Sequence, residues 1–173
     1  MVWNMVKLVY LCKKNIKIAI MRRLLLSLLL ISCGFVAGLC QAPGEAPVKW
    51  QVTVKMNGAE KGTVVFKARV QSGWHLYGMN LPKGGPKSTA IDMSESTGVE
   101  FTTPLKPDRA PLKVHDDMFG LDLTWWDSDI AFRRDFKVKN KANARIAGKI
   151  SYMSCNNETC SPPKTQSFDK IIK

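Results

Sequence analysis

The sequence is poor in side chains that bind metal ions. It has only two histidines, His75 and His115, and after residue 42 it has only two cysteines, Cys155 and Cys160. A structural zinc site needs four ligands at short spacings, and here both histidines are distant from the cysteines in the sequence. The sequence therefore predicts no metal site, and it gives no indication of a cofactor.

Helical periodicity and internal repeats are also missing. No stretch keeps a hydrophobic period of 3.6 residues over three turns, but four stretches alternate hydrophobic and polar residues with a period of two. These stretches are residues 52–56, 64–70, 130–138 (interrupted at Arg134) and 146–152. Such alternation is typical of strands with one face on a core.

Turn-forming residues separate these stretches, among them Asn57-Gly58 and Gly85-Pro86. We expect about eight or nine strands between Trp50 and Ile172. Many short strands without intervening helices predict an all-β fold, an antiparallel β-sandwich of the immunoglobulin-like or jelly-roll kind. On this pattern alone, the domain would be a binding module.

The positive charge is concentrated at the N-terminus. The 173-residue chain has a formal net charge of +12, but its first 42 residues hold six basic residues and no acidic one. The remaining 131 residues carry 20 basic and 14 acidic residues, a net charge of +6. A moderately basic domain is usually just soluble, so we expect no nucleic-acid binding.

The N-terminal segment has the layout of a secretory signal peptide. Met21-Arg22-Arg23 provides a charged start, an apolar run follows at residues 24–31, and Cys40-Gln41-Ala42 offers a cleavage site between small residues. We therefore expect residues 1–42 to be a signal region, with Met21 a better start than Met1. The rest would be a linker of residues 43–49 and a domain of residues 50–173.

Two alternatives for the signal region stay open. An apolar stretch that reaches Leu39 would be retained as a membrane anchor, although it is shorter than the roughly 20 residues of a comfortable span. The sequence Leu30-Ile31-Ser32-Cys33 partly resembles a bacterial lipoprotein box, which would leave a lipid on Cys33. In each case the domain is exported to a compartment where disulfides persist, and it touches the membrane only through this segment or this lipid.

Cys155 and Cys160 are the cysteines that remain if cleavage follows Ala42. Four residues separate them and include the turn-forming pair Asn156-Asn157, so a hairpin loop would bring the cysteines face to face at disulfide distance. Such a disulfide is either a structural staple or a redox pair. A disulfide that closes so short a loop stabilises the fold by only about 2 kcal/mol in the entropic model. A short, accessible disulfide, in contrast, exchanges readily with thiols. The residues alone leave both open.

The segment around the cysteines resembles the active-site segment of the N-terminal periplasmic domain of the thiol:disulfide interchange protein DsbD. Residues 152–163 carry the resemblance, with two cysteines four residues apart followed by two prolines. Residues 73–77, 84–86 and 115–120 resemble further segments of this family in the same order, so the resemblance covers roughly residues 50–173. The cysteine spacing in the best-known members is one residue longer.

This resemblance implies an immunoglobulin-like sandwich that carries out thiol–disulfide exchange. Electrons would come from a DsbD-like transmembrane donor through a thioredoxin-like domain and pass to periplasmic thioredoxin-fold proteins. Cys160 would form the mixed disulfides with partners, and Cys155 would resolve them. Because the resemblance stops with the chain at Lys173, we expect a free-standing version of one module. A non-redox binding or assembly module with a structural disulfide is the alternative.

The resemblance also implies a loop that caps the cysteines and influences their ionisation. Asp116 and Asp117 match the acids of this loop, which either perturb a thiol pKa or form a plain acidic turn. Met118 and Phe119 match the cap aromatics, although Met118 stands where the best-known members carry phenylalanine. A methionine is a softer shield, and its sulfur is itself oxidisable.

Two further aromatic positions complete the candidate site. Tyr77 either hydrogen-bonds a sulfur or is an ordinary tyrosine at the edge of the core. His75, where the best-known members carry tyrosine, is either a base or a packing residue. Trp125-Trp126 interrupts the alternation, which favours a core aromatic beside an edge aromatic over a partner-binding patch. The candidate site thus comprises Cys155, Cys160, Asp116, Asp117, Met118, Phe119, Tyr77 and His75.

Overall fold

Strands account for almost all regular structure in residues 46–172, the part of the chain that the computed structural model describes. This part contains twelve β-strands, one 3-10 helix at Lys141–Asn143 and no α-helix. None of its elements is a helix long and apolar enough to cross a membrane. The predicted signal region, including Cys33, lies outside the described residues. Strand β1 begins at Val48, within the last residues of the predicted linker.

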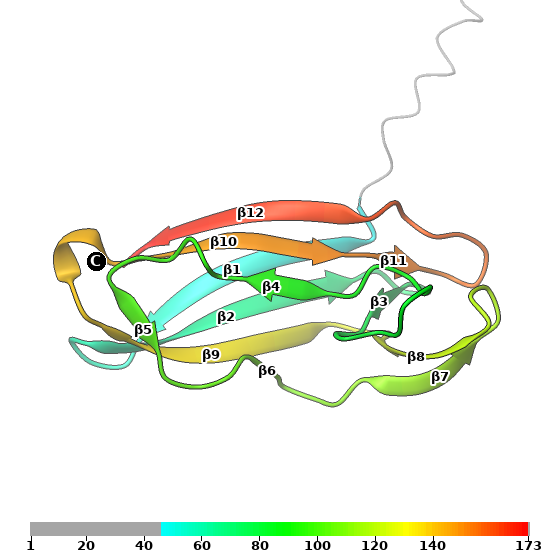
Figure 1. Cartoon of the computed structure of the whole chain (residues 1–173), viewed down its shortest axis with the longest axis horizontal. Coiled ribbons are helices and arrows are strands. Elements are labelled where there is room, and N and C mark those ends of the chain that lie inside the picture. The colour runs from blue at the N-terminus through cyan, green and yellow to red at the C-terminus, as the bar shows by residue number, and fades with distance from the viewer. Residues whose placement is uncertain (1–45, 173) are drawn as a thin grey trace, which may run out of the picture. The chain divides into compact units, whose positions relative to one another are not determined.

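The strands form three antiparallel sheets (Figure 1). The first has the order β1-β2-β9-β5, with β6 also paired to β9, and its strands are β1 (Val48–Met56), β2 (Lys61–Val70), β5 (Val99–Phe101), β6 (Lys106–Pro107) and β9 (Ile130–Val138). The second has the order β12-β10-β4, with strands β4 (Ala90–Asp92), β10 (Arg145–Tyr152) and β12 (Lys164–Ile171). The third has the order β11-β3-β8-β7, with strands β3 (His75–Tyr77), β7 (Leu112–Asp116), β8 (Leu121–Trp126) and β11 (Ser154–Cys155). The immunoglobulin-like antiparallel β-sandwich predicted from the sequence is thereby confirmed.

The core follows the alternation that the sequence shows. In β2, Val64, Phe66 and Ala68 are fully buried while their neighbours are more exposed. In β9, Phe132 packs against Trp50 and Trp126, with ring centroids 5.8 and 5.2 Å apart. Period-two burial thus assigns the inner face of each long strand correctly.

Arg134, which interrupts the pattern in β9, lies on the inward-facing phase of the strand. Its guanidinium lies over the ring of Phe101 at 4.3 Å from the centroid, and its Nε donates to the carbonyl oxygen of Thr103 at 2.8 Å. The cation–π contact and the hydrogen bond stabilise the guanidinium charge at the edge of the core. The strand therefore continues through Arg134 without interruption.

Twelve strands are present where the sequence predicts eight or nine. Five of the twelve are short: β6 and β11 have two residues each, and β3, β4 and β5 have three. Two or three residues are too few to display a period, so their strand character comes from hydrogen bonds to neighbours such as β9 and β8.

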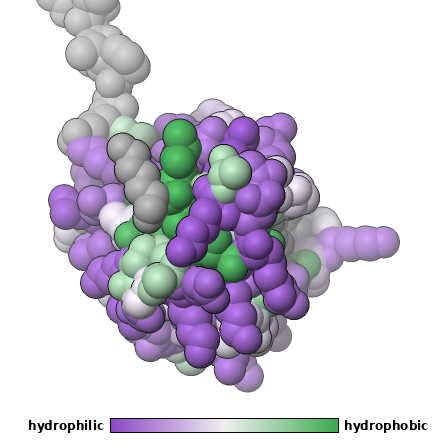
Figure 2. All heavy atoms as spheres, turned by 90° about the vertical axis from the view of Figure 1, so that its left-hand side faces the viewer, coloured by the Kyte–Doolittle hydropathy of each residue, from purple (hydrophilic) through white to green (hydrophobic). Residues whose placement is uncertain are grey.

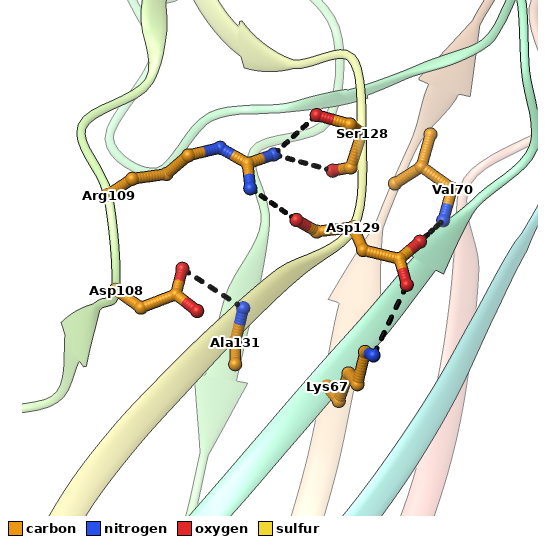
Figure 3. A network of polar contacts seen from close by, with 7 residues as sticks. All are labelled: Lys67, Val70, Asp108, Arg109, Ser128, Asp129 and Ala131. Carbon is orange, nitrogen blue, oxygen red and sulfur yellow. Dashed lines mark hydrogen bonds and ion pairs between the residues drawn. The ribbon is translucent and has the colours of Figure 1, made fainter.

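A polar network ties the base of the β7–β8 hairpin to the first sheet (Figure 3). Arg109, ahead of β7, donates to the carbonyl oxygens of Ser128 and Asp129 in the turn between β8 and β9. The Asp129 carboxylate in turn accepts from the Val70 amide at 3.1 Å and pairs with the Lys67 ammonium at 3.3 Å. The hairpin therefore projects from a fixed base.

The third sheet lies at one end of the sandwich, at the right of Figure 1, and includes the strand that carries Cys155. The opposite end faces the viewer in Figure 2, where a mainly hydrophilic surface surrounds a smaller apolar area. The predicted site residues belong to the end formed by the third sheet and its loops.

Candidate functional site

The two cysteines face each other across a tight hairpin. Cys155, the last residue of β11, forms an antiparallel bridge and a disulfide with Cys160. Inside the loop, the Asn156 amide donates to the Thr159 carbonyl oxygen at 2.9 Å, and the Asn156 side chain accepts from the amides of Glu158 and Thr159. Asn156 therefore supplies the turn chemistry that the sequence predicts, and the predicted facing of the cysteines is confirmed.

Hydrogen bonds outside the disulfide also close this hairpin. The Ser161 amide donates to the Ser154 carbonyl oxygen at 2.8 Å, and the two buried serine hydroxyls lie 2.9 Å apart. Pro162-Pro163 follows before β12 begins at Lys164. These hydrogen bonds close the hairpin in addition to the disulfide.

The two sulfur-bearing residues differ in accessibility. Cys155 is only 1% exposed and packs with Tyr77 and Leu123 in a small hydrophobic cluster. Cys160 is partly exposed at the far side of the loop. An external thiolate therefore reaches Cys160 more readily than Cys155.

The loop between β7 and β8 is organised around Asp116. One carboxylate oxygen accepts from the amides of Met118 at 3.0 Å and Phe119 at 3.3 Å, and the Asp116 carbonyl oxygen accepts from the Gly120 amide at 2.7 Å. Gly120 has a φ of 62°, the left-handed conformation that glycine adopts without steric cost. The buried Asp116 side chain thus fixes the backbone of residues 117–120, which we call the cap loop.

The second carboxylate oxygen of Asp116 accepts a hydrogen bond from the Tyr77 hydroxyl at 2.7 Å. Burial, and then the hydrogen bond and negative charge of Asp116, raise the pKa of Tyr77 above its ordinary value. The hydroxyl therefore stays protonated and holds the cap loop to β3. The Tyr77 hydroxyl thus donates to Asp116, and no hydrogen bond from it to a sulfur is found within residues 46–172.

The side chains of Met118 and Phe119 extend from the cap loop toward the disulfide and the residues around it. The Sδ atom of Met118 lies 3.4 Å from the Sγ atom of Cys160. A disulfide sulfur carries no hydrogen, so this is a van der Waals contact between two sulfurs. The Phe119 ring packs edge-on against Tyr77, with centroids 6.0 Å apart. Met118 of the cap loop therefore contacts Cys160, whereas Phe119 packs on Tyr77.

His75 is placed directly beside the buried cysteine. It pairs with Cys155 across β3 and β11, so both side chains lie on the same face of the sheet. Its ring stacks on Trp125 at 4.1 Å and meets Tyr77 edge-on at 5.0 Å. The buried Nε2 atom has no hydrogen-bond partner among residues 46–172. Burial lowers the pKa of His75, although Asp116 and Asp127 oppose this effect.

A groove of about 460 Å³ runs beside the disulfide loop. Its walls are formed by His75, Tyr77, Val114, His115, Asp116, Asp117, Met118, Trp125, Asn156 and Asn157. The structure thus gathers residues from β3, the cap loop, β8 and the cysteine loop at one place. Asp117 is exposed on this wall, whereas Asp116 is buried beneath it.

The sequence matches a family of known proteins. Residues 37–171 match the family described as thiol:disulfide interchange protein DsbD, N-terminal. The chain belongs to the DsbD N-terminal domain family. This match covers most of the chain and agrees with the resemblance identified around the cysteines.

Two solved structures resemble this DsbD N-terminal-type domain. The N-terminal periplasmic domain of ScsB from Proteus mirabilis aligns with a TM-score of 0.51 and 14% identity, covering 75% of this chain and 48% of that one. The reduced DsbD N-terminal domain of Neisseria meningitidis aligns with a TM-score of 0.36 and 14% identity, covering 70% of this chain and 84% of that one. The chain thus spans about half the length of the ScsB domain. No curated protein matches the sequence.

Trp125 is a groove residue of this DsbD-type domain that was not among the candidate site residues named from the sequence. Trp126 is buried in the core, as one half of the predicted core-and-edge pair. Trp125 is half-buried on the groove wall against His75 and Tyr77. The break in alternation was the signal for this residue, because two adjacent strand residues face opposite sides and only one can enter the core.

The two histidines of this DsbD-type domain should titrate on opposite sides of the ordinary value of 6.5. We expect the pKa of His75 to lie below it because of burial, and the pKa of His115 to lie above it because its Nδ1 atom pairs with Asp122 at 2.8 Å. Only two histidines are present, so their ring NMR signals can be followed as a function of pH.

The same shifts set the sign of the pH dependence of stability. Around pH 6.5 the unfolded chain binds more protons than folded His75, so this residue should make the free energy of unfolding fall as pH falls below 6.5. His115 acts in the opposite direction: its contribution is present below 6.5 and disappears as pH rises through its folded pKa. The His115 pair is exposed and screened by solvent, so the His75 effect should dominate. A His75 midpoint above 6.5 would contradict the burial argument.

Proposed function

We propose that this domain is an exported thiol–disulfide exchange module that passes electrons through the Cys155–Cys160 pair. The donor would be a DsbD-like transmembrane protein or a thioredoxin-like domain, and the acceptors would be periplasmic thioredoxin-fold proteins. Membership of the DsbD N-terminal domain family supports this class of reaction and of partner.

The difference in exposure between the two cysteines carries the proposal. A partner's sulfur must approach one disulfide sulfur in line with the bond that breaks. Cys160 is partly exposed and Cys155 is 1% exposed, so the disulfide offers one accessible sulfur and one protected leaving group. The hairpin is also closed by its Ser154 and Ser161 hydrogen bonds, which leaves a staple little to do.

Reduction of the domain begins with a donor thiolate that attacks Sγ of Cys160. The donor sulfur bonds to Cys160, the Cys155–Cys160 bond breaks, and Cys155 leaves as a thiolate that takes a proton from water. A second donor thiolate then attacks the donor sulfur of this mixed disulfide and releases the Cys160 thiolate. Two electrons have passed to the domain, and the donor keeps a disulfide.

Transfer to an acceptor repeats these steps in the opposite sense. The Cys160 thiolate attacks the acceptor's disulfide, and one acceptor sulfur leaves as a thiolate. Cys155 returns its proton to water, and the resulting thiolate attacks Cys160, which re-forms the Cys155–Cys160 bond and releases the second acceptor thiolate. Cys160 is thus the attacking residue, and Cys155 is the resolving residue.

The surrounding residues would position and tune this pair. Asp116 already accepts from Tyr77 and from two amides, so we assign it the role of holding the cap loop. The exposed Asp117 carboxylate would disfavour a nearby thiolate by like-charge repulsion. His75 would keep a neutral imidazole beside Cys155, and Met118 and Phe119 would cover the site.

The proposed location is the periplasm, with membrane contact only through the N-terminal segment or a lipid on Cys33. The charged start and apolar run of residues 21–31 support export. The intact mass of protein recovered from its host would distinguish a cleaved chain from a lipidated or uncleaved one, and an unmodified segment of residues 1–42 would argue against both cleavage and lipidation.

The reduction potential of the pair tests the function. We expect the Cys155–Cys160 disulfide to be reduced at a potential above about −300 mV, because structural disulfides in exported proteins usually lie below that value. Equilibration with dithiothreitol buffers, followed by alkylation and mass determination, measures it. A much lower potential would favour the alternative, a non-redox binding or assembly module with a structural disulfide.

A further inference from the structure

Met118 places a thioether against the one sulfur that a partner can reach. Its Sδ atom lies 3.4 Å from Sγ of Cys160, and the residue is 52% exposed. To form a bond, an attacking thiolate must come at least this close to Sγ. The Met118 sulfur therefore occupies the space against one side of Cys160.

The side chain of Met118 can move without its backbone. The Asp116 carboxylate accepts hydrogen bonds from the amides of Met118 and Phe119, and the Asp116 carbonyl oxygen accepts one from the Gly120 amide. These bonds fix the main chain of the cap loop. An unbranched side chain with three rotatable bonds needs only a rotamer change to turn toward water. A chemical change at Sδ would therefore uncover Cys160 while the loop stays in place.

Peroxides make such a change. The peroxide O–O bond breaks and one oxygen atom is transferred to Sδ, so the thioether loses two electrons and hydrogen peroxide is reduced to water. The Cys155–Cys160 disulfide takes no part in this step. The product is a polar sulfoxide, which favours water over contact with a disulfide sulfur.

We propose that Met118 is an oxidation site that controls access to Cys160, such that its sulfoxide exposes the disulfide to thiol attack. The inference rests on the proposed exchange function for its consequence, faster electron uptake in the presence of peroxide. The chemistry at Met118 and the uncovering of Cys160 do not depend on that function.

The test measures how fast dithiothreitol reduces the disulfide before and after treatment with hydrogen peroxide. The full chain is used in its disulfide form, with Cys12, Cys33 and Cys40 alkylated first. Peptide mass spectrometry follows the sulfoxide at Met118, and a second alkylating reagent counts newly formed thiols. We expect complete Met118 oxidation to raise the reduction rate about three- to tenfold. The free energy of an ordinary packing contact of a thioether sulfur corresponds to a rate factor of this size.

Three variants isolate the thioether. Met118→Leu keeps an apolar side chain of similar size that peroxide does not oxidise, so its reduction rate should not respond to peroxide. Met118→Ala removes the shield and should reduce as fast as the oxidised parent. Met56→Leu is the matched control, because Met56 is also exposed, at 36%, but lies at the end of β1 away from the cap loop, and it should respond like the parent.

Each other result overturns the inference. An unchanged rate at full Met118 oxidation, an equal peroxide response in Met118→Leu, or a Met118 that stays unmodified while Met56 oxidises would each do so. The proposed exchange function fails by a different measurement, a reduction potential well below the structural threshold. Because the rate ratio does not depend on that potential, the two failures are distinguishable.

Discussion

Cys155→Ser is expected to accumulate mixed disulfides through Cys160, whereas Cys160→Ser should accumulate few or none. With Cys155 replaced, the exposed Cys160 thiolate attacks an acceptor disulfide, but no neighbouring thiol resolves the product. With Cys160 replaced, the remaining Cys155 is 1% exposed, so a partner's disulfide does not reach it. The two single variants should therefore differ by about tenfold or more in trapped complex.

The measurement uses an oxidised thioredoxin-fold protein as acceptor, followed by alkylation and non-reducing electrophoresis. Cys155→Ser/Cys160→Ser is the control, because it reports the background from Cys12, Cys33 and Cys40. Equal trapping by both single variants would refute the assigned roles. Absence of trapping above the control in either variant, combined with a low reduction potential, would leave the binding module as the better function.

Phe132→Ala should cost about 3–5 kcal/mol of unfolding free energy, the range for a large aromatic removed from a packed core. Phe132 is fully buried in β9, and its ring packs against those of Trp50 and Trp126. Truncation of the side chain leaves a cavity that these rigid rings cannot fill. Total stabilities of about 5–15 kcal/mol make this a large fraction of the whole.

Urea unfolding of the disulfide form, followed by tryptophan fluorescence, gives this free energy. Leu112→Ala is the control: Leu112 is 48% exposed on β7, so its truncation should change stability by about 0.5 kcal/mol or less. If both variants were destabilised to a similar extent, the assigned core would be wrong.

The long strands and the cysteine loop were predictable because their information is local. Period-two burial in β2 and β9 follows from residues within each strand, and the turn chemistry of Asn156 follows from its own loop. Arg134 appeared as an interruption of the pattern because the group that contacts its guanidinium, the ring of Phe101, belongs to another strand.

The contacts that make the site were not predictable from spacing alone. Tyr77 and Asp116 are 39 residues apart, and neither of the two alternatives that the sequence left for Tyr77, a hydrogen bond to a sulfur or an ordinary place at the edge of the core, named Asp116 as its partner. The position of Trp125 beside His75 likewise depends on the pairing of β3 with β8. Tyr77, Asp116 and His75 were candidates because of a family resemblance, which supplies identities but no distances.

The sequence by itself determined an all-β chain, a hairpin that brings Cys155 to Cys160, and the family to which both belong. Only the tertiary structure decided which cysteine is exposed, which carboxylate is buried, and that Met118 contacts Cys160 across 42 residues of sequence. The physical reason is that alternation and turn propensity act over a few residues. Burial and long-range contact depend instead on strand register, which is fixed when the hydrophobic faces of distant strands pack together.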